Sequence, residues 1–269
     1  SGGCVEGAVV LEALDSLKDG QTKVLEYGVS DDDAFAVGLA CGGKMRVLVE
    51  PIGNHFPIEL LKELVDAIAK DRSVIYEINI ETFRRSLVYE GYEDRIRSDR
   101  SGFKEDKITF LNVFSPKLKM DIVGAVHIAQ ALVPMAKIVG FLPRIIDPRE
   151  SFANRERFFS VEISNDFPDI ALSNSEPNSR TAVILLTHDP KLDDPALHIA
   201  LKSQAFYIGA LGSKKTHEQR KVRLKNAGFT EKEINRINGP IGLDIGASSP
   251  EEIAISILSE VIANLRLVK

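Results

Sequence analysis

Two glycine-flanked cysteines are the residues of this sequence best suited to bind a soft ligand. Cys4 follows Gly3 at the head of a helical pattern, and Cys41 precedes Gly42 and Gly43. A thiol near a helix start has a lowered pKa, and glycines let a bound anion approach the backbone closely. We therefore treat Cys4 and Cys41 as candidate metal ligands of one shared site. A buried structural cysteine after a helix-start turn is the alternative.

These two cysteines are too few for a disulfide framework, although one bridge between them is possible. An acidic run at 31–33 separates the two glycine–cysteine segments. It offers a metal or acid–base site, but such a run is more often a solvated turn or a helix cap. We favour the solvated turn.

A third group of residues follows a short apolar run at 120–125. Gly124 and His127 stand where a strand turns into a helix, and Asp147 ends the next apolar run. This placement is typical of a dinucleotide-binding turn, with Asp147 in the position of a ribose-binding acid. Val126 occupies the place of the second glycine, which ordinarily lets the backbone approach a pyrophosphate. The pattern supports the architecture and disfavours tight NAD binding.

A glycine–serine turn precedes a basic helical segment further along the chain. Gly209, Gly212, Ser213 and Lys214 lie at the end of an apolar run over 206–211. Turn amides, a hydroxyl and lysines at the carboxyl end of a strand are able to bind a phosphate. An exposed helix with solvated lysines is the alternative.

Two further segments place polar residues at strand ends. His188 and Asp189 follow an apolar run, where His188 is either an acid–base group or ligand, or a purely structural hydrogen-bonding residue. Asp244 lies among the glycines of 239–246. Close packing against a neighbouring helix explains these glycines as well as a ligand does.

Composition narrows the class of protein. The chain has 269 residues, of which 44% are hydrophobic and 27% charged, which is ordinary for a globular protein. The net charge of -5 disfavours nucleic-acid binding, and no apolar run approaches the roughly 20 residues of a membrane span. We expect a soluble, cytoplasmic protein. Because Ser1 is neither an initiator methionine nor part of a signal peptide, we expect an upstream segment to precede it.

The elements that must position these residues fall into two parts that meet at Ser115 and Pro116. Residues 1–115 are predicted to form a small α/β domain, and residues 116–269 a Rossmann-like, doubly wound parallel sheet, because strands and helices alternate there. Helices are expected at 8–17 and 57–70. A further helix follows the strand at 120–125 and ends at 139, and the last helix begins at 249. Strands are expected at 24–27, 45–50, 73–80, 108–114, 120–125, 142–146, 181–187, 206–211 and 241–245.

Taken together and in this order, the segments resemble the XdhC/CoxI family of xanthine dehydrogenase accessory factors. The likeness is carried mainly by 1–7, 38–43, 187–190, 209–217 and 239–246. The resemblance implies an N-terminal α/β domain before a Rossmann-type domain. It implies binding of molybdenum cofactor (molybdopterin), its protection during oxo-to-sulfido exchange, and its delivery to an apo-molybdoenzyme. Cys4 and Cys41 would then lie near the molybdenum–dithiolene end, while other residues would line the nucleotide-like cleft: Gly124, Asp147, Gly209, Gly212 and Ser213.

The working hypothesis is a cofactor chaperone, not a turnover enzyme. A xanthine-dehydrogenase-type molybdoenzyme is the expected client, a cysteine desulfurase is a further candidate partner, and we expect a homodimer. The rival hypothesis is an NAD(P)-dependent oxidoreductase that uses the strand–glycine–helix turn and Asp147. A third is a protein-interaction scaffold built on a nucleotide fold that has lost its ligand.

Overall fold

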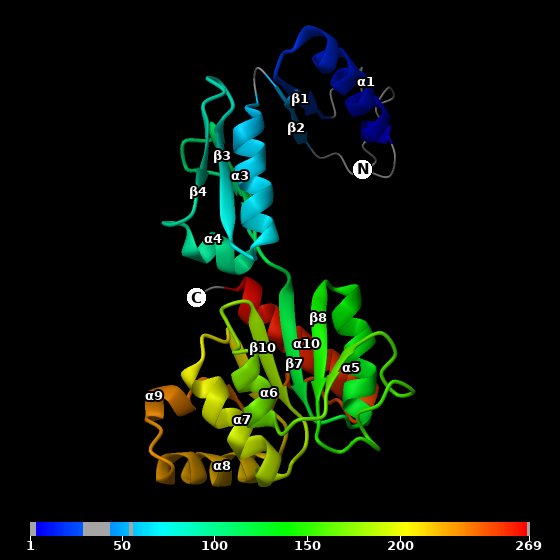
Figure 1. The fold of residues 1–269 in the computed structure, drawn as a ribbon, viewed down its shortest axis with the longest axis vertical. Coiled ribbons are helices and arrows are strands. Elements are labelled where there is room, and N and C mark those ends of the chain that lie inside the picture. The colour runs from blue at the N-terminus through cyan, green and yellow to red at the C-terminus, as the bar shows by residue number, and fades with distance from the viewer. Residues whose placement is uncertain (1–3, 29–43, 54–55, 268–269) are drawn as a thin grey trace. The chain divides into compact units, whose positions relative to one another are not determined.

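A computed structural model describes residues 4–28, 44–53 and 56–267 of the chain (Figure 1). The chain forms two compact units, Ser1–Ser115 and Pro116–Lys269. None of the helices in the described segments is both long enough and apolar enough to cross a membrane. The predicted fold class, a smaller N-terminal α/β region followed by a Rossmann-like parallel sheet, is confirmed.

The described residues of the N-terminal unit form two antiparallel sheets. Strands β1 and β2 pair with each other, and the other sheet has the order β4-β3-β6-β5. Helix α3 lies beside this four-stranded sheet, where Leu64 and Ala67 pack against Val74. The elements are α1 (Cys4–Asp19), β1 (Lys23–Tyr27), β2 (Met45–Val49), α3 (Ile58–Ala69), β3 (Val74–Asn79), β4 (Arg85–Val88), α4 (Glu93–Ser98), β5 (Gly102–Phe103) and β6 (Thr109–Phe114).

The C-terminal unit is built on a six-stranded sheet with the order β12-β11-β10-β7-β8-β9. Each neighbouring pair in it is parallel. The chain winds outward from β7 to β9, returns to the other side of β7, and winds outward again to β12, which is the Rossmann order. The strands are β7 (Leu118–Val123), β8 (Phe141–Ile146), β9 (Glu162–Ser164), β10 (Thr181–Leu185), β11 (Tyr207–Ala210) and β12 (Ile237–Asn238).

Helices cover both faces of this sheet (Figure 1). Successive strand residues point to opposite faces, so Ile184 of β10 packs toward α5 and α10, while Val183 packs toward α6 and α7. A strand buried on both faces must be apolar throughout, and all of β10 is buried. The helices are α5 (His127–Ile138), α6 (Pro168–Asn174), α7 (Pro190–Lys202), α8 (Lys214–Asn226), α9 (Glu231–Ile234) and α10 (Pro250–Arg266).

One predicted strand of the C-terminal unit is wrong. Residues 241–245 form a loop before α10, and the outermost strand is instead β12, Ile237–Asn238. Gly242 and Gly246 both have positive φ angles, 96° and 75°, which an extended strand does not have. The apolar pattern arises because Ile241 is buried against the core next to α10, not because it pairs in the sheet.

The start of α10 is set by a complete capping box. The Ser249 hydroxyl accepts from the amide of Glu252, while the Glu252 carboxylate accepts from the amide of Ser249, and Pro250 occupies the first turn. Two amides that the helix itself leaves unpaired are satisfied in this way. The box fixes where α10 meets the carboxyl edge of the sheet.

We predict that Ser249→Ala lowers the free energy of unfolding by about 1 kcal/mol, because the amide of Glu252 loses its acceptor. The shift in the urea midpoint measures this loss. Ser259→Ala, inside the same helix, is the control and should leave the stability unchanged or slightly raised, since alanine is the better helix former. Equal losses in both variants would contradict the capping role.

Candidate functional site

The carboxyl edge of the parallel sheet is the candidate functional site. The strand order reverses between β7 and β10, and ligands of such sheets bind in the crevice beyond the strand ends at this switch point. Here the chain leaves β7 through Gly124, leaves β10 through Thr187 and leaves β11 through Leu211. Each of these positions therefore faces the same edge.

A cavity of about 290 Å³ lies at this point, and we call it the switch-point cavity. The turn after β7, the residues after β10 and the start of α10 form its walls. They are largely apolar, with two histidines and two hydroxyl side chains among them. The lining residues are Val126, His127, Ile128, Leu186, Thr187, His188, Leu211, Ser248, Pro250 and Ile253.

A second cavity, of about 400 Å³, adjoins it and is formed mainly by the loop before α10; we call it the loop cavity. Leu211 and Ile253 line both cavities. Lys214 and Asp244 are its charged residues, and apart from Ser256 the remaining walls are backbone and apolar side chains. The full lining is Leu211, Lys214, Pro240, Ile241, Gly242, Leu243, Asp244, Ile245, Gly246, Ala247, Ile253 and Ser256.

Gly124 lets the ends of β7 and β10 approach each other closely. Its φ angle is 108°, and a Cβ added there would lie 2.8 Å from Cγ2 of Thr187 and 3.2 Å from the Thr187 backbone nitrogen. An L-residue would be both strained and obstructed at this position. The glycine is thus required by the backbone geometry of the crevice itself.

Asp147 ends β8 and is fully buried. Its carboxylate accepts from the amide of Ala125 at 2.9 Å and from Nε and Nη2 of Arg149 at 2.8 and 2.7 Å. Burial raises the pKa of Asp147, but the hydrogen bonds from Arg149 and Ala125 outweigh it and hold the pKa below its ordinary value. Both carboxylate oxygens are therefore engaged within the protein.

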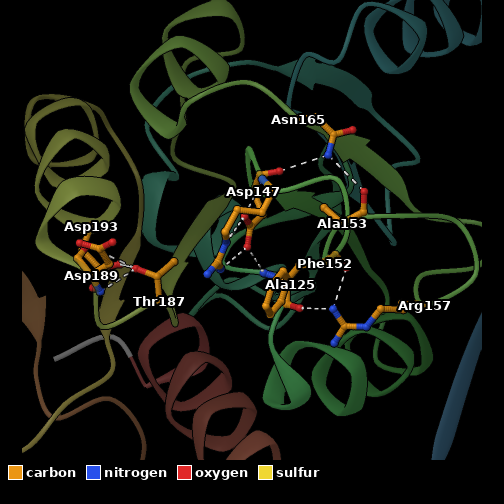
Figure 2. Close-up of polar contacts among 10 residues, drawn as sticks. Ala125, Asp147, Phe152, Ala153, Arg157, Asn165, Thr187, Asp189 and Asp193 are labelled. Atoms are coloured by element: carbon orange, nitrogen blue, oxygen red, sulfur yellow. Dashed lines mark hydrogen bonds and ion pairs between the residues drawn. The ribbon is translucent and has the colours of Figure 1, made fainter.

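A buried polar network joins the ends of β10 and β11. The Thr187 hydroxyl donates to Asp193 at 2.5 Å (Figure 2), and Nη2 of Arg220 lies 3.7 Å from the other oxygen of Asp193. Nη2 of Arg220 also donates to the Leu211 carbonyl at 2.8 Å. Burial raises the pKa of Asp193 and lowers that of Arg220. Through this network Thr187 and Leu211, which both line the switch-point cavity, are held in one arrangement.

Five of the candidate residues from the sequence lie at the two cavities or beside them. His127 and His188 line the switch-point cavity and are exposed, and His188 has a positive φ of 60°. Lys214 and Asp244 line the loop cavity. Asp189 follows His188 and caps α7, where its carboxylate accepts from the amide of Lys191.

The other candidates of this unit shape the edge without lining either cavity. Gly209 is buried in β11, where a Cβ would lie 2.5 Å from the Ile241 side chain. Gly212 has a φ of 143° in the turn that follows. The Ser213 hydroxyl caps α8 by accepting from the amide of Thr216. The carboxylate of Asp147 accepts hydrogen bonds from Ala125 and Arg149.

The thiol site lies largely outside the described residues. Gly3, Cys41, Gly42 and Gly43 all fall there, and Cys4 is described only as the first residue of α1, in the other unit. Within the described segments, no group of three or more His, Cys, Asp or Glu residues is arranged to hold a metal ion. The shared thiol site therefore stays a prediction.

Sequence reasoning missed Arg149. It stands two positions after Asp147, forms an ion pair with it, and keeps 42% of its side chain exposed. An arginine two positions after a strand-end acid is the signal that would have found it, since an arginine near this acid is used in some Rossmann domains to accept a phosphate.

The fold and the crevice define a Rossmann-type ligand-binding domain. Residues 120–261, more than half of the chain, match the family model described as the XdhC Rossmann domain. The chain belongs to this family, which confirms the resemblance noted from the sequence.

Relatives match over almost the whole chain. It is 29% identical over 267 residues to the molybdenum cofactor insertion chaperone PaoD of Escherichia coli (strain K12), covering 99% of this chain and 73% of that protein. It is 25% identical over 284 residues to a protein of Bacillus subtilis (strain 168) named as a probable xanthine dehydrogenase subunit, covering 97% of this chain and 82% of that protein. A crystal structure described as that of a xanthine dehydrogenase from Bacillus halodurans has a TM-score of 0.77 and 27% identity, covering 100% of this chain and 82% of that one.

We predict that Gly124→Ala destabilises the C-terminal unit by at least about 1 kcal/mol more than Gly140→Ala does. Gly140 also has a positive φ, 93°, but a Cβ there meets nothing within 4 Å. Both variants carry the cost of backbone strain, and only Gly124→Ala adds a collision with Thr187. Urea unfolding of the two variants measures the difference, and equal losses would show that the close approach of β7 and β10 is unimportant.

We predict that Asp147→Asn lowers the stability at neutral pH by about 2 kcal/mol, because charge-assisted hydrogen bonds are lost. The pKa of Asp147 is lowered in the folded protein, so its contribution is present above the unfolded-state pKa and is lost as the pH falls through the folded-state pKa. The gap between wild type and variant should therefore shrink in acid. Glu156→Gln, exposed on the same loop, is the control and should change the stability by less than about 0.5 kcal/mol throughout.

Proposed function

We propose that the protein binds molybdenum cofactor, protects it, and delivers it to a molybdoenzyme of the xanthine-dehydrogenase type. The observation that carries the proposal is the pair of adjoining cavities at the switch point of a domain that belongs to the XdhC family. The relative named as a molybdenum cofactor insertion chaperone supports the same role, since the match covers 99% of this chain.

The chemistry of the two cavities suits a ligand with a ring system and an anionic end. Apolar walls such as Val126, Leu186 and Ile253 would pack against the ring system of a pterin. The exposed Lys214 lines the loop cavity, and the exposed Arg149 is joined through Asp147 to the turn that precedes Val126. The cofactor supplies the oxygen- and sulfur-transfer chemistry of the client enzyme, and this chain is proposed to hold it rather than to turn it over. Cys4 and Cys41 would bind the metal end.

Two partners follow from this role. The client molybdoenzyme must receive the cofactor, and exchange of an oxo for a sulfido ligand needs a sulfur donor, for which a cysteine desulfurase is the matching class of enzyme. A homodimer would shield the bound cofactor further. Each of these remains part of the proposal.

The Rossmann strand order also favours a second candidate, an NAD(P)-dependent oxidoreductase. Two features of the crevice disfavour the binding of NAD(P). The carboxylate that would bind a ribose, Asp147, is occupied by Ala125 and Arg149. The Val126 side chain lines the cavity at the position where a glycine normally admits the pyrophosphate.

We predict that His127→Glu lowers cofactor retention about tenfold or more, because a carboxylate in the switch-point cavity repels the anionic ligand. The fold should tolerate the change, since an acidic residue in the first turn of a helix is favourable. Molybdenum by mass spectrometry and pterin by fluorescence are measured on protein purified after co-expression with cofactor synthesis. Cys41→Ala should also lower retention.

Ile170→Glu is the matched control, because it places the same carboxylate in the first turn of α6 at an exposed site away from both cavities. It should retain cofactor as the wild type does. Wild-type protein that holds no cofactor would refute the proposal. If that protein instead bound NAD(H) at submicromolar concentration in calorimetry, the oxidoreductase would be supported.

A further inference from the structure

The loop between β8 and β9, residues 147–161, holds both backbone polar groups of Ala125. Asp147 accepts from the Ala125 amide at 2.9 Å, and Nη1 of Arg157 donates to the Ala125 carbonyl at 2.9 Å (Figure 2). Arg157 also donates to the Phe152 carbonyl at 2.8 Å and to Oε1 of Gln130 at 2.9 Å. The turn that opens the switch-point cavity is thus fixed to this loop at two points.

Arg149 is presented by the same loop in a fixed orientation. Its Nε and Nη2 form two parallel hydrogen bonds to the fully buried Asp147, and its Cζ lies 4.3 Å from the centre of the Phe152 ring. A guanidinium has five N–H donors in a planar fork, and Asp147 engages those on one edge. The adjoining edge, formed by Nη1 and the second hydrogen of Nη2, has no partner among the described residues.

The position of this free edge follows from two contacts. The same oxygen of Asp147, Oδ2, accepts from the Ala125 amide and from Nη2 of Arg149, so the guanidinium lies against the β7–α5 turn. The hydrogen bond from Arg149 to Asp147 raises the pKa of Arg149, and the charge of Asp189, beyond the end of β10, raises it as well. The guanidinium of Arg149 therefore lies beside the backbone of the turn between β7 and α5.

Ala125 and Asp189, the two residues near Arg149, are each next in sequence to a residue that lines the switch-point cavity. Val126 follows Ala125 in the chain, His188 precedes Asp189, and both Val126 and His188 line the cavity. A cation with an open hydrogen-bonding edge stands where a dinucleotide-binding domain would offer a ribose-binding carboxylate. This geometry favours an anionic hydrogen-bond acceptor at the edge in place of the neutral ribose hydroxyl that a carboxylate would bind.

We propose that Arg149 binds a phosphate group of the ligand that enters the switch-point cavity, through the free edge of its guanidinium. Arginine forks match phosphate oxygens in a bidentate manner, which makes a phosphate monoester or diester the fitting class of ligand. The inference deepens the proposed function, since it assigns the residue that holds the phosphate of a pterin cofactor. The binding itself needs no molybdenum.

Asp189 gives the proposal a second, independent test. Its carboxylate is a negative charge that interacts with Arg149, and it opposes the approach of an anion. Asp189→Asn removes this charge and keeps the cap of α7, because asparagine is an equally good cap residue. The variant is expected to bind phosphate a few-fold more tightly than the wild type, in line with weak partly screened repulsion.

The experiment titrates the full chain with inorganic phosphate at low ionic strength and follows the amide signals of Ala125 and Val126 by NMR. We expect Arg149→Ala to weaken phosphate binding about tenfold or more, the loss of one charge-assisted bidentate contact, and Arg149→Lys to fall between. Arg155→Ala removes an exposed arginine of the same loop that forms no hydrogen bond or ion pair with Asp147 or Ala125, and it should bind phosphate as the wild type does.

Unchanged binding by Arg149→Ala, or an equal loss in Arg155→Ala, would overturn the proposal, as would weaker binding in Asp189→Asn. The outcome is separable from that of the proposed function. Phosphate binding that depends on Arg149 in a protein retaining no molybdenum cofactor would leave this inference standing and remove the chaperone role. Full cofactor retention by Arg149→Ala, with unchanged phosphate binding, would do the reverse.

Discussion

The backbone of Gly124 and Ala125 is the constraint on which the rest of the candidate site depends. β7 lies at the switch point with β10 on one side and β8 on the other, and hydrogen bonds to both neighbours continue past its end, from Gly124 to Ile146 and from Leu186 to Val123. The close approach to Thr187 excludes any side chain at Gly124. A displacement of this turn would move two walls of the switch-point cavity at once, the turn after β7 and the residues after β10. That explains why the β8–β9 loop binds the amide and the carbonyl of Ala125 with charged side chains.

The network of Thr187, Asp193 and Arg220 is better understood as a device for geometry than as a source of stability. Burial is the largest cause that raises the pKa of the acid and lowers that of the arginine, and Nε of Arg220 has no hydrogen-bond partner among the described residues. A buried ion pair often contributes little net stability after its desolvation. What this pair does provide is a fixed Thr187 hydroxyl and a fixed Leu211 carbonyl at the ends of adjacent strands.

Most of the sheet was predictable because strands buried on both faces must be continuous apolar runs, as β10 is. The error at 241–245 arose from the same rule, since Ile241 is buried without pairing, and a sequence pattern reports burial and not hydrogen bonding. β12 has only two residues, too few for any periodicity. Within the site, Asp147 was correctly placed at a strand end, yet the direction of its carboxylate depends on Ala125 and Arg149, and no local pattern contains that information. Arg149 itself is one charge among many in 144–157, and the sequence does not distinguish it from an ordinary solvated residue.

Three positions separate this crevice from an NAD-binding one of the same strand order. Val126 narrows the approach to the turn amides, Asp147 turns its carboxylate inward, and Arg149 places a cation in front of it. Val126 and Asp147 both weaken dinucleotide binding, because they obstruct the pyrophosphate and remove the acceptor for the ribose, whereas Arg149 adds a hydrogen-bond donor for a phosphate at the same edge. An apolar cavity behind a single oriented cation favours a ligand with a broad ring system and one anionic end. The sheet topology is thus retained while the recognition chemistry at its carboxyl edge is altered, and this is why the strand order by itself is a poor guide to the ligand.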